Sequence, residues 1–186
     1  EYVEMILQHN KKSVVILDEA YVDFGAQSAV SLINHYPNLL VIRTLSKSHS
    51  LAGLRVGFVL GHEDLIHGIS RVKDSINSYT VDRLAQAGAL AAIKDVVYFQ
   101  ETRSKVIHTR ERVATRLTEI GFQVIPSLTN FLFVSHAQHP GRVLFQKLRE
   151  KGILVRYFDK PKIDNFIRIT IGTDEEMDVF LEAKAV

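Results

Sequence analysis

The chain has 186 residues, of which 46% are hydrophobic and 24% are charged, and its net charge is +2. This balance is typical of a globular protein of one or two domains. Charges of both signs are interleaved without a basic stripe, which argues against a nucleic-acid partner. No apolar run approaches the ~20 residues that cross a bilayer, so we expect no membrane partner. The absence of cysteine excludes disulfides and thiolate chemistry, and it fits a cytoplasmic protein.

The first half of the chain has the pattern of an α/β domain. A continuous apolar run over residues 14–17 stops at Asp18, which predicts a strand buried on both faces, as in a parallel sheet. We expect a helix over 28–35, a second buried strand over 39–43 and a third strand over 55–60. A strand, a helix and a strand in this order favour a right-handed parallel crossover.

The second half has the pattern of long helices followed by an α+β region. Residues 81–120 are helical in pattern, and short strands are predicted over 122–127, 130–135, 153–158 and 165–172, with a helix over 140–152. Thr173 is expected to cap a last helix whose first turn is acidic. We place the domain boundary within the long helical region, so that one domain takes residues 1–94 and a small α+β domain takes residues 95–186.

Two charged residues follow neighbouring strands of the predicted sheet. Asp18 ends the first buried strand, and Lys47 lies just after the second, in the stretch RTLSKSHSLAGLRVGF. Ligands of open α/β sheets bind outside the carboxyl ends of the strands, so both side chains are expected at the same edge, within reach of Tyr21. The alternative is structural: Asp18 would cap a turn and Lys47 would be solvated.

Residues that can bind a phosphate surround Lys47. Hydroxyls come from Thr44, Ser46 and neighbouring serines, and Arg55 offers a planar fork that donates two parallel hydrogen bonds. Lysine amines form Schiff bases with carbonyl groups. A lysine, phosphate-binding groups and a strand-end aspartate together indicate a site for pyridoxal phosphate. No histidine pair has the HExxH spacing, and we expect no metal site.

Arg168 lies in the middle of a predicted strand. Alternation in NFIRITIG puts Ile167 and Ile169 on one face and Arg168 on the other. An arginine in this position needs an anion, because an unpaired buried charge is costly. The anion is either a ligand or a structural acid such as Glu175.

Five segments together carry a resemblance to a known family: ILDEAYVDF, RTLSKSHSLAGLRVGF, TNFLFV, GILVRYF and FIRITIGTDEE. In these segments and their order the chain resembles the C-terminal half of the histidinol-phosphate aminotransferases, fold-type-I pyridoxal phosphate enzymes of aminotransferase class II. The resemblance implies an α/β fold, with the C-terminal part of the large three-layer αβα domain followed by the small α+β domain. It also implies that the third strand runs antiparallel to its neighbour, and that the enzyme is a homodimer.

The resemblance implies a role for each matching residue. Lys47 would bind the cofactor aldehyde and move a proton at the substrate's α-carbon, Asp18 would keep the pyridine nitrogen protonated, and Tyr21 would hydrogen-bond the phenolic oxygen. Thr44, Ser46 and Arg55 would hold the cofactor phosphate. Arg168 would bind the α-carboxylate of the amino donor, and Arg156 the substrate phosphate. Asn130 matches a position near the cofactor, or it only shapes its turn. His49 departs from the aromatic residue that is common there in the family, and its role stays open.

The function implied is transamination between histidinol phosphate and 2-oxoglutarate in histidine biosynthesis. Enzymes of the family are about twice as long as this chain, so we expect a fragment that exposes apolar sheet surface and is inactive by itself. An aromatic aminotransferase and a threonine-phosphate decarboxylase of the same branch are close alternatives. A dimerising interaction module without catalysis is the alternative from another class.

Overall fold

The computed structural model describes residues 2–183, and the chain divides into two compact units between Gln100 and Glu101. The boundary predicted from sequence, between residues 94 and 95, comes just before the long helix α4 (Val96–Glu119), whereas the division lies inside that helix. None of the helices in residues 2–183 is long and apolar enough to cross a membrane.

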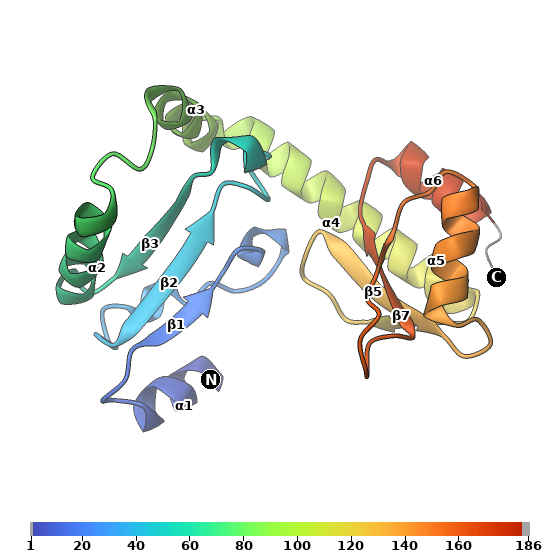
Figure 1. The fold of residues 1–186 in the computed structure, drawn as a ribbon, viewed down its shortest axis with the longest axis horizontal. Coiled ribbons are helices and arrows are strands. Elements are labelled where there is room, and N and C mark those ends of the chain that lie inside the picture. Colours follow the sequence, from blue (N-terminus) through green and yellow to red (C-terminus); the bar gives the residue numbers. More distant parts are fainter. Residues whose placement is uncertain (1, 184–186) are drawn as a thin grey trace. The chain divides into compact units, whose positions relative to one another are not determined.

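A three-stranded sheet forms the centre of the first unit (Figure 1). Its strands are β1 (Val15–Asp18), β2 (Leu39–Thr44) and β3 (Gly57–Gly61), in the order β1-β2-β3. The pair β1–β2 is parallel and the pair β2–β3 antiparallel, which confirms the three predicted strands and the direction of the third. Asp18 is paired in register with Ile42, so β1 and β2 end at the same edge of the sheet.

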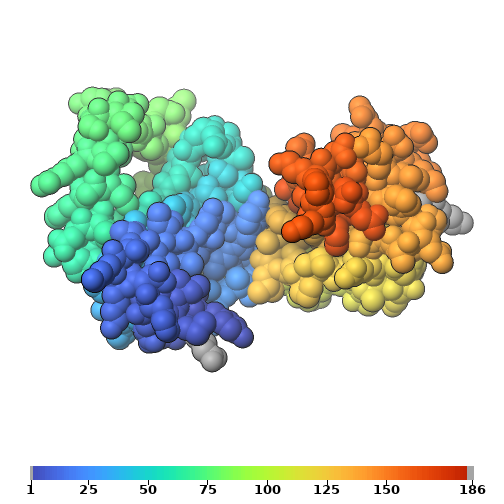
Figure 2. All heavy atoms as spheres, turned by 60° about the horizontal axis from the view of Figure 1, so that its bottom comes forward, coloured from blue at the N-terminus to red at the C-terminus, as the bar shows by residue number. Residues whose placement is uncertain are grey.

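One face of this sheet is covered by the chain's own helices and turns. Leu7 of α1 (Tyr2–His9) packs with Leu39 and Val41 of β2, and all three side chains are fully buried. Figure 2 shows α1, in dark blue, on the surface of this unit. The other α-helices in the described part of this unit are α2 (Glu63–Ile76), α3 (Arg83–Lys94) and the first turn of α4.

The helix predicted over residues 28–35 is wrong. The structure has only a single 3₁₀ turn there, η2 (Val30–Leu32). The Glu19 carboxylate accepts hydrogen bonds from the Ser28 hydroxyl and the Ala29 amide, and the Ser28 hydroxyl oxygen accepts one from Val30. Side-chain acceptors of this kind hold the backbone in turns and compete with a regular helix.

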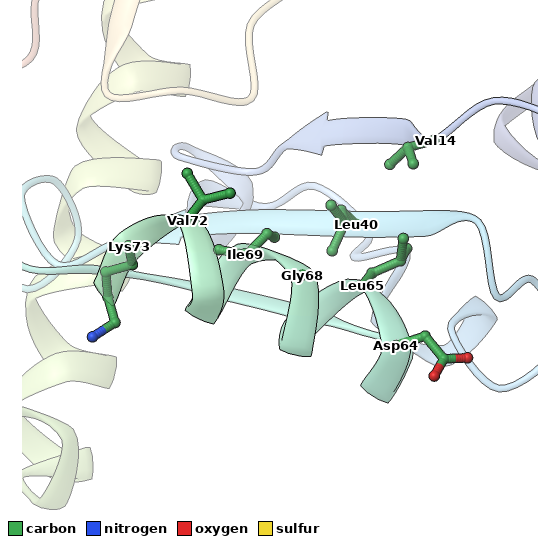
Figure 3. Close-up of a pocket in the computed structure, with 8 residues that line it drawn as sticks. All are labelled: Val14, Leu40, Asp64, Leu65, Gly68, Ile69, Val72 and Lys73. Carbon is green, nitrogen blue, oxygen red and sulfur yellow. The ribbon is translucent and has the colours of Figure 1, made fainter. Parts of the chain in front are cut away.

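The other face of the sheet carries exposed apolar side chains. Ile16 is 57% exposed and Val14 is 48% exposed, so the prediction that this strand is buried on both faces is wrong for this chain. A groove of about 520 Å³ runs between this face and α2 (Figure 3). Figure 3 shows Leu65 and Ile69 of α2 on the side that faces Leu40 of β2. The expectation that the chain exposes apolar sheet surface is confirmed for this face.

The second unit is built around an antiparallel sheet in the order β4-β5-β7-β6. Its strands are β4 (Phe122–Ile125), β5 (Phe131–His136), β6 (Arg156–Tyr157) and β7 (Phe166–Thr170). The strand predicted over 153–158 is therefore much shorter, because only Arg156 and Tyr157 have partners on β7.

Helices cover the core face of this second sheet. They are α4, α5 (Gly141–Glu150) and α6 (Asp174–Glu182). Ile167 and Ile169 are buried in the core with Val113 of α4, as the alternation in β7 predicts. Thr173 caps α6, and its capping box with Glu176 confirms the predicted helix start.

Candidate active site

The residues singled out in the sequence fall into two groups, one in each unit. The first unit holds Asp18, Tyr21, Thr44, Ser46, Lys47 and Arg55, and the second holds Asn130, Arg156 and Arg168.

The first group gathers at the edge of the sheet where β1 and β2 end. Asp18 is the last residue of β1, and its carboxylate accepts a hydrogen bond of 3.0 Å from the Ala20 amide. The Lys47 amine, in the loop after β2, lies 5.2 Å from the centroid of the Tyr21 ring. Within residues 2–183, neither the Asp18 carboxylate nor the Lys47 amine has an ionic partner, and both side chains are exposed. They are therefore available to a ligand.

The loop around Lys47 is held in an unusual conformation. The Thr44 hydroxyl accepts a hydrogen bond from the Ser46 amide at 3.1 Å and lies 3.4 Å from the Val56 carbonyl oxygen. Ser50 and Arg55 have φ angles of 57° and 56°, in the left-handed region that non-glycine residues avoid. Such strained residues cluster at ligand sites, where the surrounding structure fixes them.

Arg55 presents a cationic group close to this loop. One guanidinium nitrogen donates to the Ala52 carbonyl at 2.8 Å, and the side chain is otherwise exposed. No acid within the described residues neutralises its charge, and the Ser46 hydroxyl has no protein partner there either. The group thus offers a guanidinium and a hydroxyl to an anion.

Sequence reasoning missed a charged network behind the loop. Arg43 donates to the Glu19 carboxylate at 3.0 Å and to the Ser28 hydroxyl at 2.8 Å, and lies 3.8 Å from Asp23. All four residues are at least partly buried. The signal was present, because a charged residue at the end of a buried strand requires a partner. The partners are 15 to 24 residues away in sequence, so the pattern alone did not identify them.

The second group brings two arginines together on one face of a sheet. Arg156 of β6 and Arg168 of β7 are direct cross-strand partners. Like charges in that position repel each other and destabilise the pair of strands. In the described part of the chain neither guanidinium forms an ion pair, and Glu175, the structural acid considered for Arg168, does not bind it. An anion bound between them would relieve the repulsion.

Aromatic rings hold both arginines. The guanidinium carbon of Arg168 lies 5.1 Å from the centroid of Phe131, and that of Arg156 lies 5.5 Å from Phe158. Both distances are within the range of cation–π attraction. The Nε atom of Arg168 is buried and has no hydrogen-bond partner. A buried donor without a partner is rare in proteins and points to a ligand that supplies the acceptor.

Asn130 lies at the entry to β5. Its backbone carbonyl accepts a hydrogen bond from Ile171 at 2.9 Å. The hydroxyls of Ser127 and Thr129 make the hydrogen bonds of this turn, to the backbone of Phe131. The Asn130 side chain contributes none of them.

Comparisons with known proteins show which family this chain resembles. The family model for aminotransferase class I and II matches residues 1–183. A histidinol-phosphate aminotransferase of Clostridium beijerinckii is 57% identical over 182 residues, which are 98% of this chain and 51% of that protein. One of Clostridium acetobutylicum is 58% identical over 180 residues, with 97% and 51% covered. The chain thus spans about half the length of the curated relatives it matches.

A solved structure agrees with these matches. The histidinol-phosphate aminotransferase of Sinorhizobium meliloti, in complex with pyridoxal-5'-phosphate, superposes with a TM-score of 0.83 at 27% identity, over 97% of this chain and 51% of that one. The lysine loop at the sheet edge and the paired arginines are therefore found on a fold that the relatives share. By this fold and by a match along nearly its whole length, the chain belongs to the class I and II aminotransferase family.

Proposed function

We propose that the first group of residues holds pyridoxal phosphate. The groups that this cofactor requires are present: an exposed amine at Lys47, a carboxylate without a cationic partner at Asp18, and a hydroxyl and a guanidinium free for a phosphate at Ser46 and Arg55. The fold supports the proposal, since a relative of the same fold is in complex with this cofactor. When bound, the cofactor supplies an electrophilic aldehyde and a ring that accepts the electron pair of the substrate's α-carbon.

Each residue then has one task. The Lys47 amine binds the aldehyde carbon and carries a proton at the substrate's α-carbon. The Asp18 carboxylate accepts a hydrogen bond from the ring nitrogen and favours its protonated form. The Tyr21 hydroxyl donates to the phenolic oxygen. Thr44, Ser46 and Arg55 bind the phosphate.

The substrate is proposed to bind at the paired arginines. A guanidinium fork binds a carboxylate or a phosphate through two parallel hydrogen bonds. Arg168 is assigned the α-carboxylate and Arg156 the substrate phosphate, with Asn130 beside the cofactor. The pair Arg156–Arg168 is the observation that carries this assignment, because two facing cations without acidic partners fit a substrate with two anionic groups.

The proposed reaction moves the amino group of glutamate to imidazole-acetol phosphate, which gives 2-oxoglutarate and histidinol phosphate, a step of histidine biosynthesis. We propose that it is carried out in the cytoplasm by a homodimer of the complete enzyme. The names of the relatives support the reaction, and the chain spans about half the length of these relatives.

The test uses a chimera in which residues 1–186 replace the matching half of a curated relative. We expect the chimera to form glutamate from histidinol phosphate and 2-oxoglutarate. Arg156→Met should raise KM for histidinol phosphate about 10- to 100-fold, the value of one or two charge-assisted hydrogen bonds. KM for an unphosphorylated aromatic amino acid should change less than twofold.

Four outcomes would contradict the proposal. Equal loss for both substrates would remove Arg156 from the phosphate site. Turnover of aromatic amino acids alone would favour an aromatic aminotransferase, and release of carbon dioxide from threonine phosphate would favour a decarboxylase. A folded chimera without activity toward any of these substrates would favour the dimerising interaction module without catalysis.

A further inference from the structure

The loop that carries Lys47 needs an anchor, because the amine itself has little to hold it. The Lys47 side chain is exposed, and its amine lies over the ring of Tyr21. Loop hydrogen bonds join Ser50 to the Lys47 carbonyl and Leu51 to the Leu45 carbonyl. The direction of the amine therefore depends on what fixes the residues next to it.

Ser48, the next residue, is held by a hydrogen bond to the turn that follows Tyr21. The residue is 7% exposed, and its hydroxyl donates to the Asp23 carboxylate at 2.6 Å. Asp23 belongs to the short turn η1 (Val22–Phe24), which directly follows Tyr21. Arg43 lies 3.8 Å from the same carboxylate and holds it in place. One short turn thus positions both the ring near the Lys47 amine and the anchor of its neighbour.

His49 continues the chain of contacts. Its Nδ1 atom lies 3.2 Å from the Ser48 hydroxyl oxygen. A hydroxyl has one proton to donate, and Ser48 gives it to Asp23, so the proton between Ser48 and His49 must come from Nδ1. The neutral imidazole in this arrangement is the Nδ1–H tautomer.

The imidazole also stacks on an aromatic ring. The centroids of His49 and Phe99 are 4.5 Å apart and their planes differ by 19°. Phe99 belongs to the first turn of α4, so the stacking attaches the loop to a helix. Burial lowers the pKa of His49, although the charge of Asp23 acts in the opposite direction, and the lowered pKa favours the neutral ring.

We propose that Asp23, Ser48, His49 and Phe99, together the Ser48 brace, position the Lys47 amine, and that His49 acts as a positioning residue through its Nδ1–H. This inference rests on the proposed function, in which Lys47 binds the cofactor aldehyde. The ring of His49 has two contacts in this brace, because it stacks on Phe99 and its Nδ1–H is the donor for Ser48.

The test compares replacements of His49 in the chimera. The measurement is the rate at which pyridoxal phosphate is trapped by borohydride at Lys47, followed by peptide mapping, beside kcat and KM. His49→Phe keeps the stacking and removes the donor, and we expect trapping and kcat to fall about tenfold, which corresponds to about 1.4 kcal/mol, with KM changed less than twofold. Ser48→Ala should have the same effect.

Two amides test the tautomer. The amide nitrogen of His49→Asn takes the place of Nδ1 and should restore at least half of the lost trapping rate, whereas that of His49→Gln takes the place of Nε2 and should not. His67→Phe, on the exposed surface of α2, is the matched control and should trap at the wild-type rate. Thermal unfolding of each variant separates loss of fold from loss of position.

The outcomes separate the brace from the proposed function. If the wild-type chimera traps the cofactor at Lys47 and the folded His49→Phe and Ser48→Ala variants trap it equally fast, the brace is wrong and the function stands. Equal rates for His49→Asn and His49→Gln would refute the tautomer and the positioning role of Nδ1. If the wild-type chimera does not trap at Lys47, both proposals fail.

Discussion

Arg168 is held by an aromatic ring while its Nε donor is left without a partner. The ring of Phe131 lies 5.1 Å from the guanidinium carbon, and the buried Nε points to an acceptor from outside the chain. Lysine cannot reproduce this arrangement, since it has no planar fork and its compact charge is more strongly hydrated. Replacing Arg168 by lysine therefore tests whether the site needs only a positive charge or the planar guanidinium fork.

We expect Arg168→Lys to raise the KM of the chimera for glutamate about 10- to 100-fold, as the bidentate contact is lost. Arg142→Lys is the matched control, because Arg142 also lies near a ring, 5.6 Å from that of Tyr157, but has the acidic partner Asp159. Steady-state kinetics at varied glutamate measures both. A KM within twofold of wild type for Arg168→Lys would mean that charge alone is sufficient.

At the scale of elements, the acidic start of α6 is bound to α4. The Thr109 hydroxyl and the Arg112 guanidinium both donate to Asp174 at 2.9 Å, and these bonds lower the pKa of the Asp174 carboxyl. A carboxyl with a lowered pKa stabilises the fold above its unfolded pKa of about 3.9. The stabilisation is lost as the pH falls below that value and through the folded pKa.

Thr109→Val removes the hydrogen bond that contributes most to this shift. We expect the variant to be less stable than wild type at about pH 6. The difference should shrink toward about pH 3, as the pH falls below the unfolded pKa of the Asp174 carboxyl and the carboxyl begins to take up its proton. Urea unfolding at both pH values measures it. Thr115 is an exposed threonine on the same helix and serves as the control. The difference in stability between Thr115→Val and wild type should be the same at both pH values. An equal difference for Thr109→Val at both pH values would exclude Asp174 as the cause.

Elements with a strong local pattern could be predicted from the sequence. The apolar run before Asp18 identified β1, and Thr173 marked the start of α6. Alternation along β7 put Arg168 on the face of the sheet opposite to that of the buried Ile167. The helix over 28–35 was wrong because Glu19, distant in sequence, supplies acceptors to its first residues. Local pattern does not contain that contact.

The same limit applies to the candidate site. Candidate residues could be identified from the sequence, because a lysine and an aspartate follow neighbouring strands and an arginine lies in mid-strand, and their roles stay predictions. The contacts that fix them could not: Ser48 meets Asp23, and His49 meets Phe99, across long stretches of chain. Arg156 and Arg168 are cross-strand partners because of the register of β6 against β7. The alternation of residues within a strand does not specify that register.

At the scale of the whole molecule, the first unit has one covered and one bare sheet face. The bare face includes Ile16 and Val14, and the groove beside α2 adds Val72, which is 60% exposed. Exposed apolar surface of this kind marks a region that normally packs against something. The relatives are about twice as long, and we assign its cover to the part they have in addition.

This assignment predicts a difference in dye binding. We expect the chain of residues 1–186 to bind the apolar dye ANS and to self-associate, and the chimera to do so much less, because the added half covers the groove. Fluorescence and light scattering at equal concentrations measure it. Ile16→Lys should lower the dye signal of the chain. Val179→Lys, on α6 of the other unit, should leave most of that signal, although Val179 is as exposed as Ile16, at 60% against 57%. Equal fluorescence of chain and chimera would show that the face stays open.

The central claim is that Lys47 is the lysine that binds the cofactor. The most direct measurement is to incubate the chimera with pyridoxal phosphate, reduce with borohydride and map the labelled peptide, with Lys47→Arg as control and the exposed Lys73 as internal reference. We predict label concentrated on the peptide of Lys47 and absent from the Lys47→Arg variant. Label spread evenly over Lys73 and the other lysines, unchanged by the substitution, would contradict the assignment of this loop as the cofactor site.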